Sequence, residues 1–182
     1  MPATFEKIAT STLTSAASSI TFTNIDQTYT DLEIHIEVKA ASSPGQHIYF
    51  RCGNNSYDSS SSYGNQALYA RGAPATAFSG DWNTSLLTQW YLPYNSYISS
   101  AANKFSQQIV YIFNYSATNT KKSLRYLSNT ITGNSNEYAS IETGQSLWNS
   151  TSAINQIQFY HSNTSTNLDS GCTITIYGIK KA

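Results

Sequence analysis

Six aromatic side chains are the first chemical candidates in this sequence of 182 residues. They lie in two stretches, 57–69 and 82–97, where Ser, Thr, Asn and Gln occupy many of the positions between them. Carbohydrate sites combine a flat aromatic ring with amide and hydroxyl groups and need little charge, but the same rings also fill sandwich cores and subunit interfaces. We therefore predict that this set forms either a glycan site or a subunit contact: Tyr57, Tyr63, Trp82, Trp90, Tyr91 and Tyr94.

Catalytic groups are sparse by comparison. His35, His47 and His161 lie on a strand face or at strand ends, without the His-x-His or His-Glu-x-x-His spacing of a metal site. Glu33 and Glu37 share a strand face, but their Cα atoms would lie about 13 Å apart, whereas the carboxyl groups of a retaining glycosidase lie about 5–5.5 Å apart. Phosphate-loop, dinucleotide and nucleophile-elbow motifs are missing from the sequence. We expect no catalytic residue, no metal site and no cofactor.

The two cysteines, Cys52 and Cys172, each fall on the apolar side of a predicted strand. This placement favours two buried free thiols, and a single disulfide between them is the alternative. The sequence has no second pair of cysteines that would suggest a zinc site.

The composition is neutral and rich in hydroxyl and amide groups. Charged residues make up 11% of the chain and the formal net charge is zero, while Ser, Thr and Asn supply 65 residues. Nucleic-acid binding requires a basic surface, and the longest basic runs here are the pairs Lys121-Lys122 and Lys180-Lys181, so we expect no nucleic-acid partner. A net charge of zero also removes electrostatic protection against self-association. We therefore expect a homo-oligomer, with a trimer as the favoured state.

Membrane and export signals are missing from the sequence as given. No apolar run approaches the roughly 18 residues of a membrane span. Residues 1–7 lack the apolar centre of a signal peptide. We expect neither membrane insertion nor secretion.

The elements that position these residues are predicted to be strands. The clearest is Asp31–Val38, in which Leu32, Ile34, Ile36 and Val38 alternate with polar residues, as in a strand with one buried face. A sheet with one face on the core and the other exposed to solvent is usually antiparallel. We predict an all-β fold, an antiparallel β-sandwich with jelly-roll connectivity, as a single domain over residues 1–182.

Turn signals every eight to twelve residues indicate further strands around this one. The expected strands are 5–10, 19–23, 47–52, 67–71, 107–115, 122–130, 137–141, 154–160 and 172–179. Segment 107–115 is apolar on both phases, which predicts either a strand covered on both faces or a strand in a subunit contact. We expect loops at 54–65 and 72–80, a turn at 146–148, and either helix or strand at 82–92. A short helix between 96 and 105 is a further alternative.

Both ends of the chain carry a family resemblance. The segments Phe5–Thr10, Ser19–Phe22 and Tyr29–Ile34, together with the closing segment Gly171–Ile179, resemble small virion proteins of tailed bacteriophages, notably marine and cyanobacterial ones. The resemblance implies a β-sandwich that decorates the capsid or forms a head fibre or tail component, and it brings no catalytic residues with it.

The functional expectation follows from this resemblance and from the neutral composition. It is a phage structural protein on the exterior of the virion, such as a capsid decoration or cement protein or a fibre knob. Its expected partners are further copies of itself and other virion proteins, and its expected location is the virion, assembled in the host cytoplasm. The first alternative is a fibre or tail tip that binds a glycan on the host surface. The second alternative is a polysaccharide-degrading enzyme.

Overall fold

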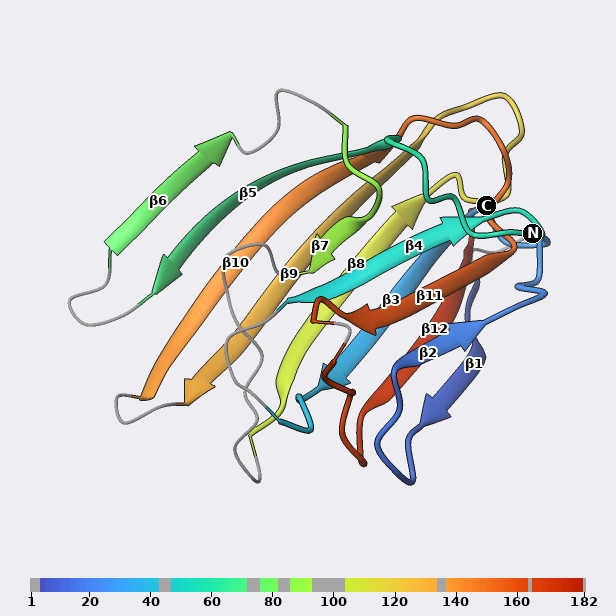
Figure 1. Cartoon of the computed structure of the whole chain (residues 1–182). Helices are drawn as coiled ribbons and strands as arrows, with labels where there is room; N and C mark the ends of the chain where they lie inside the picture. Colours follow the sequence, from blue (N-terminus) through green and yellow to red (C-terminus); the bar gives the residue numbers. More distant parts are fainter. Residues whose placement is uncertain are drawn as a thin grey trace.

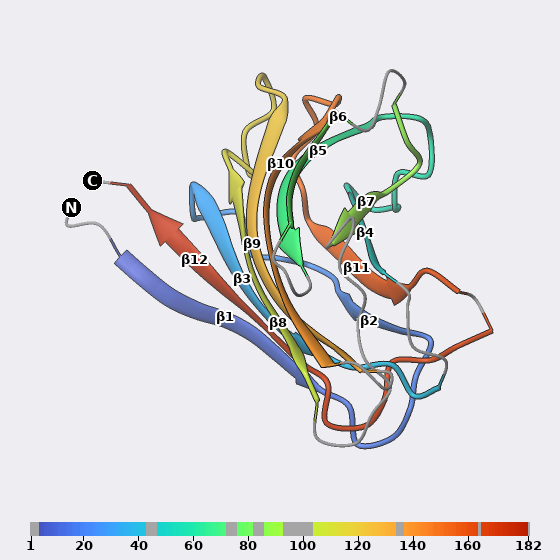
Figure 2. The same cartoon turned by 90° about the vertical axis from the view of Figure 1, so that its left-hand side faces the viewer.

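Twelve strands and no helix make up the regular structure of the computed structural model, which describes residues 4–42, 47–71, 76–81, 86–92, 104–133, 137–163 and 165–181. The strands form two sheets that face each other (Figures 1 and 2). Their bounds are β1 Thr4–Thr12, β2 Ser19–Phe22, β3 Asp31–Val38, β4 Ile48–Gly53, β5 Tyr63–Arg71, β6 Thr76–Asp81, β7 Trp90–Leu92, β8 Ser106–Phe113, β9 Lys122–Gly133, β10 Glu137–Trp148, β11 Gln156–His161 and β12 Thr173–Lys180.

The larger sheet has eight strands in the order β1-β12-β3-β8-β9-β10-β5-β6, and the smaller has four in the order β2-β11-β4-β7. Neighbouring strands run antiparallel in both sheets, which confirms the predicted all-β antiparallel sandwich. The chain crosses repeatedly between the sheets, as it does in a jelly roll. A jelly roll, however, has eight strands in all, and the large sheet alone holds that many, so the jelly-roll connectivity is not confirmed.

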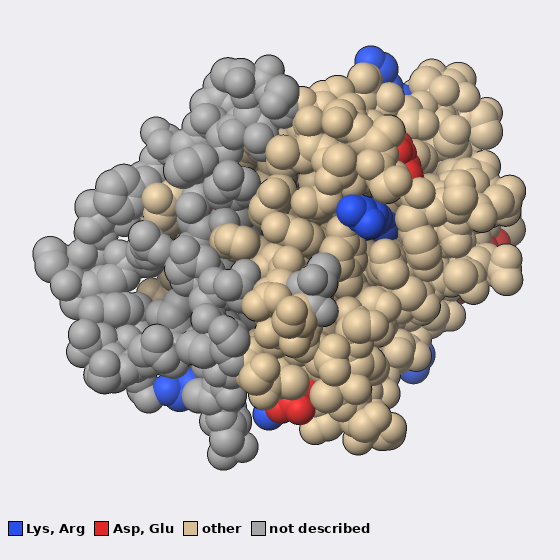
Figure 3. Space-filling model, in the orientation of Figure 1, with Lys and Arg blue, Asp and Glu red and all other residues tan. Residues whose placement is uncertain are grey.

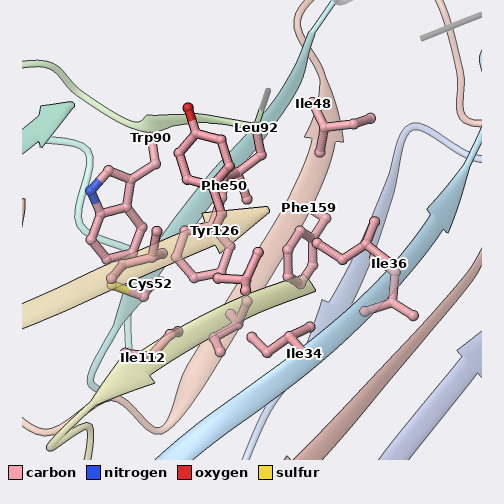
Figure 4. Close-up of a cluster of buried hydrophobic side chains, with 14 of the residues drawn as sticks. Ile34, Ile36, Ile48, Phe50, Cys52, Trp90, Leu92, Ile112, Tyr126 and Phe159 are labelled. Carbon is pink, nitrogen blue, oxygen red and sulfur yellow. The ribbon is translucent and has the colours of Figure 1, made fainter. Parts of the chain in front are cut away.

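The core lies between the two sheets and is built by alternation. On β3, Leu32, Ile34, Ile36 and Val38 are buried and point toward the small sheet, as predicted. Figure 4 shows how two of them, Ile34 and Ile36, meet aromatic residues that come from the small sheet. The small sheet supplies buried side chains from all four of its strands: Ile20, Phe22, Ile48, Phe50, Cys52, Trp90, Leu92, Ile157 and Phe159.

Parts of three predicted connections are strands in the structure. The expected loop 72–80 contains most of β6, which pairs along β5, although its sequence shows no alternation of apolar and polar residues. The expected turn 146–148 is the end of β10, where Trp148 is buried. The expected loop 54–65 ends early because Tyr63, which opens β5, is fully buried. In each case pairing with a neighbouring strand prevails over weak local preference.

Strand β8 differs in another way from its prediction. Val110 and Ile112 are buried in the core, whereas Ile109 and Tyr111 are half-exposed and Phe113 is exposed. The chain therefore covers one face of β8 and leaves apolar groups on the other. Of the two alternatives that the sequence left open, coverage on both faces is wrong for this chain, and a subunit contact stays a prediction.

The remaining predictions concern cysteines and helices. Cys52 and Cys172 are both buried free thiols, so the disulfide alternative is not formed. Most of segment 96–105, in which a short helix was an alternative, lies outside the described residues. Within the described ranges, no helix is long and apolar enough to span a membrane.

Candidate functional site

Two of the predicted aromatic residues belong to the core. Trp90 is fully buried, stacks on Phe50 with ring centroids 4.7 Å apart, and donates its indole N–H to the carbonyl oxygen of Leu147 at 3.2 Å. Tyr63 is also buried and lies edge-on to Trp90 at 5.0 Å. Its hydroxyl donates to the carbonyl oxygen of Asp58 at 2.8 Å. Neither ring can receive a ligand, so the prediction of a surface site is wrong for both.

Tyr91 lies on the outer face of the small sheet, within a row of aromatic rings. It packs edge-on against Tyr49 at 4.7 Å and against His47 at 5.9 Å. Tyr49 in turn contacts Tyr160 at 5.5 Å, and the guanidinium of Arg51 lies 5.1 Å from the Tyr160 ring centre. Each of these rings packs against a neighbouring ring in the row. We therefore assign this row to packing of the small sheet.

Of the three other predicted aromatic residues, the structure describes only Tyr57. Tyr57 is half-buried beside Gly53, and burial raises the pKa of its hydroxyl. Trp82 and Tyr94 lie outside the described residues, so their roles stay predictions. The structure therefore does not bring the predicted set together as one surface site.

A groove on the opposite side of the molecule is the strongest candidate site. In Figure 2 the large sheet bends, so that β1 and β12 splay away from β9 and β10. The outer face of β12, β3, β8 and β9 is hollowed there into an open groove of about 450 Å³, which we call the outer groove. Ligand sites for small molecules occupy about 300–1,000 Å³. The outer groove is therefore large enough for one.

One end of the outer groove is formed by an ordered aromatic group. Tyr177 stacks on Phe5 with ring centroids 4.7 Å apart and planes 12° from parallel. His35 lies on the other neighbouring strand, 5.0 Å from the Tyr177 ring, and its Nε2 is 2.6 Å from a carboxylate oxygen of Glu33. These contacts hold the Tyr177 ring in place and engage the Glu33 carboxylate within the chain.

One long side of the outer groove is polar. Glu37 on β3 is the direct cross-strand partner of Gln107 on β8, which is in turn the partner of Asn129 on β9. All three side chains are exposed, and none has a hydrogen-bond or ion-pair partner among the described residues. Because neighbouring strands lie about 4.7–4.9 Å apart, the three polar groups form one row across the sheet. We call it the polar row.

Glu37 is unusual among the carboxylates whose side chains the structure describes. The others are held by named partners: Glu6 by Tyr29, Asp26 by the amide of Thr28, Asp31 by Asn114 and Lys181, Glu33 by His35, Asp58 by Ser60, Ser62 and Trp148, Glu142 by Tyr126, and Asp169 by Lys39. Glu37 alone has no such partner in the described ranges. Its carboxylate is thus available to a ligand in the outer groove.

A second feature of the same sheet face is apolar. Leu127 on β9 and Leu68 on β5 are both cross-strand partners of Thr143 on β10. Ile141 lies two residues before Thr143 and therefore on the same face of β10. Leu68 and Ile141 are 57% exposed and Leu127 is 47% exposed. We call these three residues the apolar patch. Contiguous exposed apolar groups on a soluble domain mark contact surfaces more often than single ones do.

Charge is sparse over the visible part of the surface. Figure 3 shows the side of the small sheet, where the few charged side chains are scattered among neutral ones. Over the described residues, no cluster of three or more His, Cys, Asp or Glu side chains could hold a metal ion.

Comparison with protein-family models, with curated proteins and with solved structures gives no match to this chain.

Sequence reasoning identified part of the outer groove but did not recognise it as a site. It placed His35, Glu33 and Glu37 on the wet face of their strand, where the structure has them. It did not join Glu37 to Gln107 and Asn129, because the order β3-β8-β9 and its register are set by tertiary pairing.

Proposed function

We propose that this chain is a structural protein that acts through protein–protein contacts on the exterior of a bacteriophage particle, as the resemblance of its two ends implies. The observation that carries the proposal is the apolar patch on the outer face of the large sheet. A β-sheet face with exposed aliphatic groups is suited to packing against another sheet or subunit.

The partner we propose for the apolar patch is a second copy of the same chain. The patch carries no charged side chain, and the chain as a whole has a formal net charge of zero, so two copies approach without net repulsion. Phe113 and Leu147 are also exposed on the same sheet face, but the row of Tyr111, Arg125 and Gln145 separates them from the apolar patch. The trimer remains the favoured state of assembly.

Self-association is tested by light scattering after size exclusion. The double variant Leu68→Thr/Ile141→Thr keeps β-branched residues, which suit strands, but removes apolar surface from the apolar patch. We expect the natural chain to form an oligomer and the double variant to be a monomer. The control is Phe5→Thr, which removes an equally exposed apolar group from β1 at the other edge of the sheet. A monomeric natural chain, or equal masses for the chain and the double variant, would overturn the contact.

The location is tested separately, with particles of the phage whose genome carries the gene. We expect the protein to co-sediment with purified particles and an antibody against it to label their exterior in electron micrographs. The purified protein should also bind particles that lack it. If it is missing from the particles and binds no particle component, the structural role is wrong.

A further inference from the structure

We infer that the outer groove binds a neutral oligosaccharide, with the polar row as its hydrogen-bonding side and the Tyr177 ring as its aromatic wall. This site is distinct from the aromatic set that the sequence suggested. It shares Leu127 with the apolar patch, but the inference does not rest on the proposed structural role. The shape of the outer groove, the chemistry of the polar row and of the Tyr177 ring, and the charge of the lining all favour such a ligand.

The shape fits an extended ligand that lies across strands. The outer groove is open to solvent and crosses β12, β3, β8 and β9, so that a chain of sugar rings could lie along it. Beside the polar row, its lining includes the apolar side chains of Ile109 and Leu127. Ligand pockets typically combine such an apolar lining with a few polar groups that fix orientation.

The polar row supplies the hydrogen-bonding groups that sugar hydroxyls need. Glu37 accepts hydrogen bonds, while the amides of Gln107 and Asn129 each donate and accept. A sugar hydroxyl also donates and accepts, so neighbouring hydroxyl groups match a carboxylate and two amides in a row. Because these three side chains have no partner among the described residues, binding would not break existing hydrogen bonds.

The Tyr177 ring supplies the second recognition element. Pyranose rings present C–H groups that pack on aromatic surfaces, and an ordered ring costs little conformational entropy when it binds. Tyr177 is held between Phe5 and His35. It lies in the groove together with the hydroxyl-bearing Thr173 and Thr175.

Charge selects among classes of ligand. No lysine or arginine lines the outer groove, whereas Glu37 places a negative charge in it. Phosphate, sulfate and carboxylate groups would therefore be repelled, which disfavours nucleic acids and acidic glycans. The groove carries hydrogen-bonding groups without a strong apolar pocket for a side chain, which favours a neutral sugar over a peptide.

A glycan array with neutral and anionic oligosaccharides, followed by calorimetric titration of the best neutral ligand, tests the assignment. We expect binding to neutral glycans, and a loss of about tenfold in affinity for each of Gln107→Ala and Asn129→Ala. The matched control is Gln145→Ala, an exposed amide on β10 of the same sheet face that does not line the groove. The control should bind as the natural chain does.

Several outcomes would overturn the inference. These are the absence of glycan binding, binding confined to anionic glycans or to peptides, and equal affinities for the polar-row variants and the control. Both polar-row variants replace exposed side chains, so they should fold normally, and a melting curve checks this. A natural chain that is a monomer but binds neutral glycans would reject the self-association of the proposed function and leave the glycan site standing. A natural chain that forms the oligomer but binds no glycan would reject the glycan site and leave the self-association standing.

Discussion

Tyr126 lies across the backbone of Gly144, its direct cross-strand partner, so closely that a Cβ at position 144 would be 2.4 Å from two ring carbons. The ring has little room to move, because Tyr126 is buried and its hydroxyl donates to a carboxylate oxygen of Glu142 at 2.5 Å. An aromatic ring that covers a strand glycine in this way compensates for the missing side chain.

We therefore predict that Gly144→Ala lowers the free energy of unfolding by about 1–3 kcal/mol, as overpacking of a core does. The control is Gly64→Ala on β5, where the nearest atoms to a new Cβ are 3.7 and 3.8 Å away. That change should leave stability equal or raise it by up to about 1 kcal/mol. Urea denaturation of both variants decides the matter, and equal losses would show that the ring is not the cause. In a Tyr126→Leu background, Gly144→Ala should cost much less.

Trp90→Ala tests whether this tryptophan is structural. Its ring is fully buried between Phe50 and Tyr63, so we expect a loss of about 3–5 kcal/mol in the free energy of unfolding. Tyr91→Ala is the comparison, because Tyr91 is the next residue on the same strand and is half-exposed on the other face. It should cost less than half as much. Similar costs for the two would mean that the small sheet packs differently from our description.

His161 predicts a dependence of stability on pH. It is buried at the end of β11, and burial lowers the pKa of its imidazole below 6.5 although a hydrogen bond to the backbone of Asn163 opposes the shift. Between the folded and the unfolded pKa, the unfolded chain binds more protons at this position, so stability falls as the pH falls below about 6.5. The slope contributed by one group is at most about 1.4 kcal/mol per pH unit.

The measurement is the free energy of unfolding at several pH values between 7.5 and 5. His161→Gln keeps an acceptor for the Asn163 amide but does not titrate. We expect a flatter profile for this variant, whatever its stability at pH 7.5. His35→Gln is the control, because His35 is exposed on the other sheet. If His35→Gln flattened the profile and His161→Gln did not, the prediction for His161 would be wrong.

The cysteines should be unreactive while the chain is folded. Cys52 and Cys172 are buried, and burial raises the pKa of both thiols, so little thiolate forms near neutral pH. We expect an aromatic disulfide reagent to label neither residue in the native protein and two thiols per chain in denaturant. A reducing agent should leave the melting temperature unchanged. Rapid labelling of the native protein at either position would contradict the burial.

The strands that could be predicted are those with a strong local pattern. Asp31–Val38 is predicted to the residue, because four buried aliphatic side chains alternate without interruption. Segment 76–81, with one phenylalanine among small and polar residues, has no such pattern and becomes a strand by pairing with β5. A strand can thus be predicted where apolar and polar residues alternate along it. It cannot be predicted where the segment becomes a strand only by pairing with a neighbour.

The candidate site shows the same limit more severely. The polar row joins residues 37, 107 and 129, which share a face because three strands meet in one register. A slip of one residue in any strand would send its polar group to the core side, and no local feature of the sequence states the register. Two of the aromatic residues that the sequence suggested for a surface site, Trp90 and Tyr63, are buried. The polar residues that surround them in the sequence do not reveal this burial.

The position of β12 in the large sheet has a consequence for how the chain is made. β12 lies between β1 and β3, so neither of these strands can form this pairing before β12 is present. The hydroxyls of Thr12 and Thr173, for example, form a hydrogen bond across a separation of 161 positions. During synthesis residues 4–12 and 31–38 therefore remain without this neighbour until residues 173–180 have left the ribosome. Folding that depends on such distant contacts is slow and leaves unpaired edges exposed. A nascent chain of this protein would thus need protection from aggregation until residues 173–180 have emerged, and it can complete its larger sheet only from that point on.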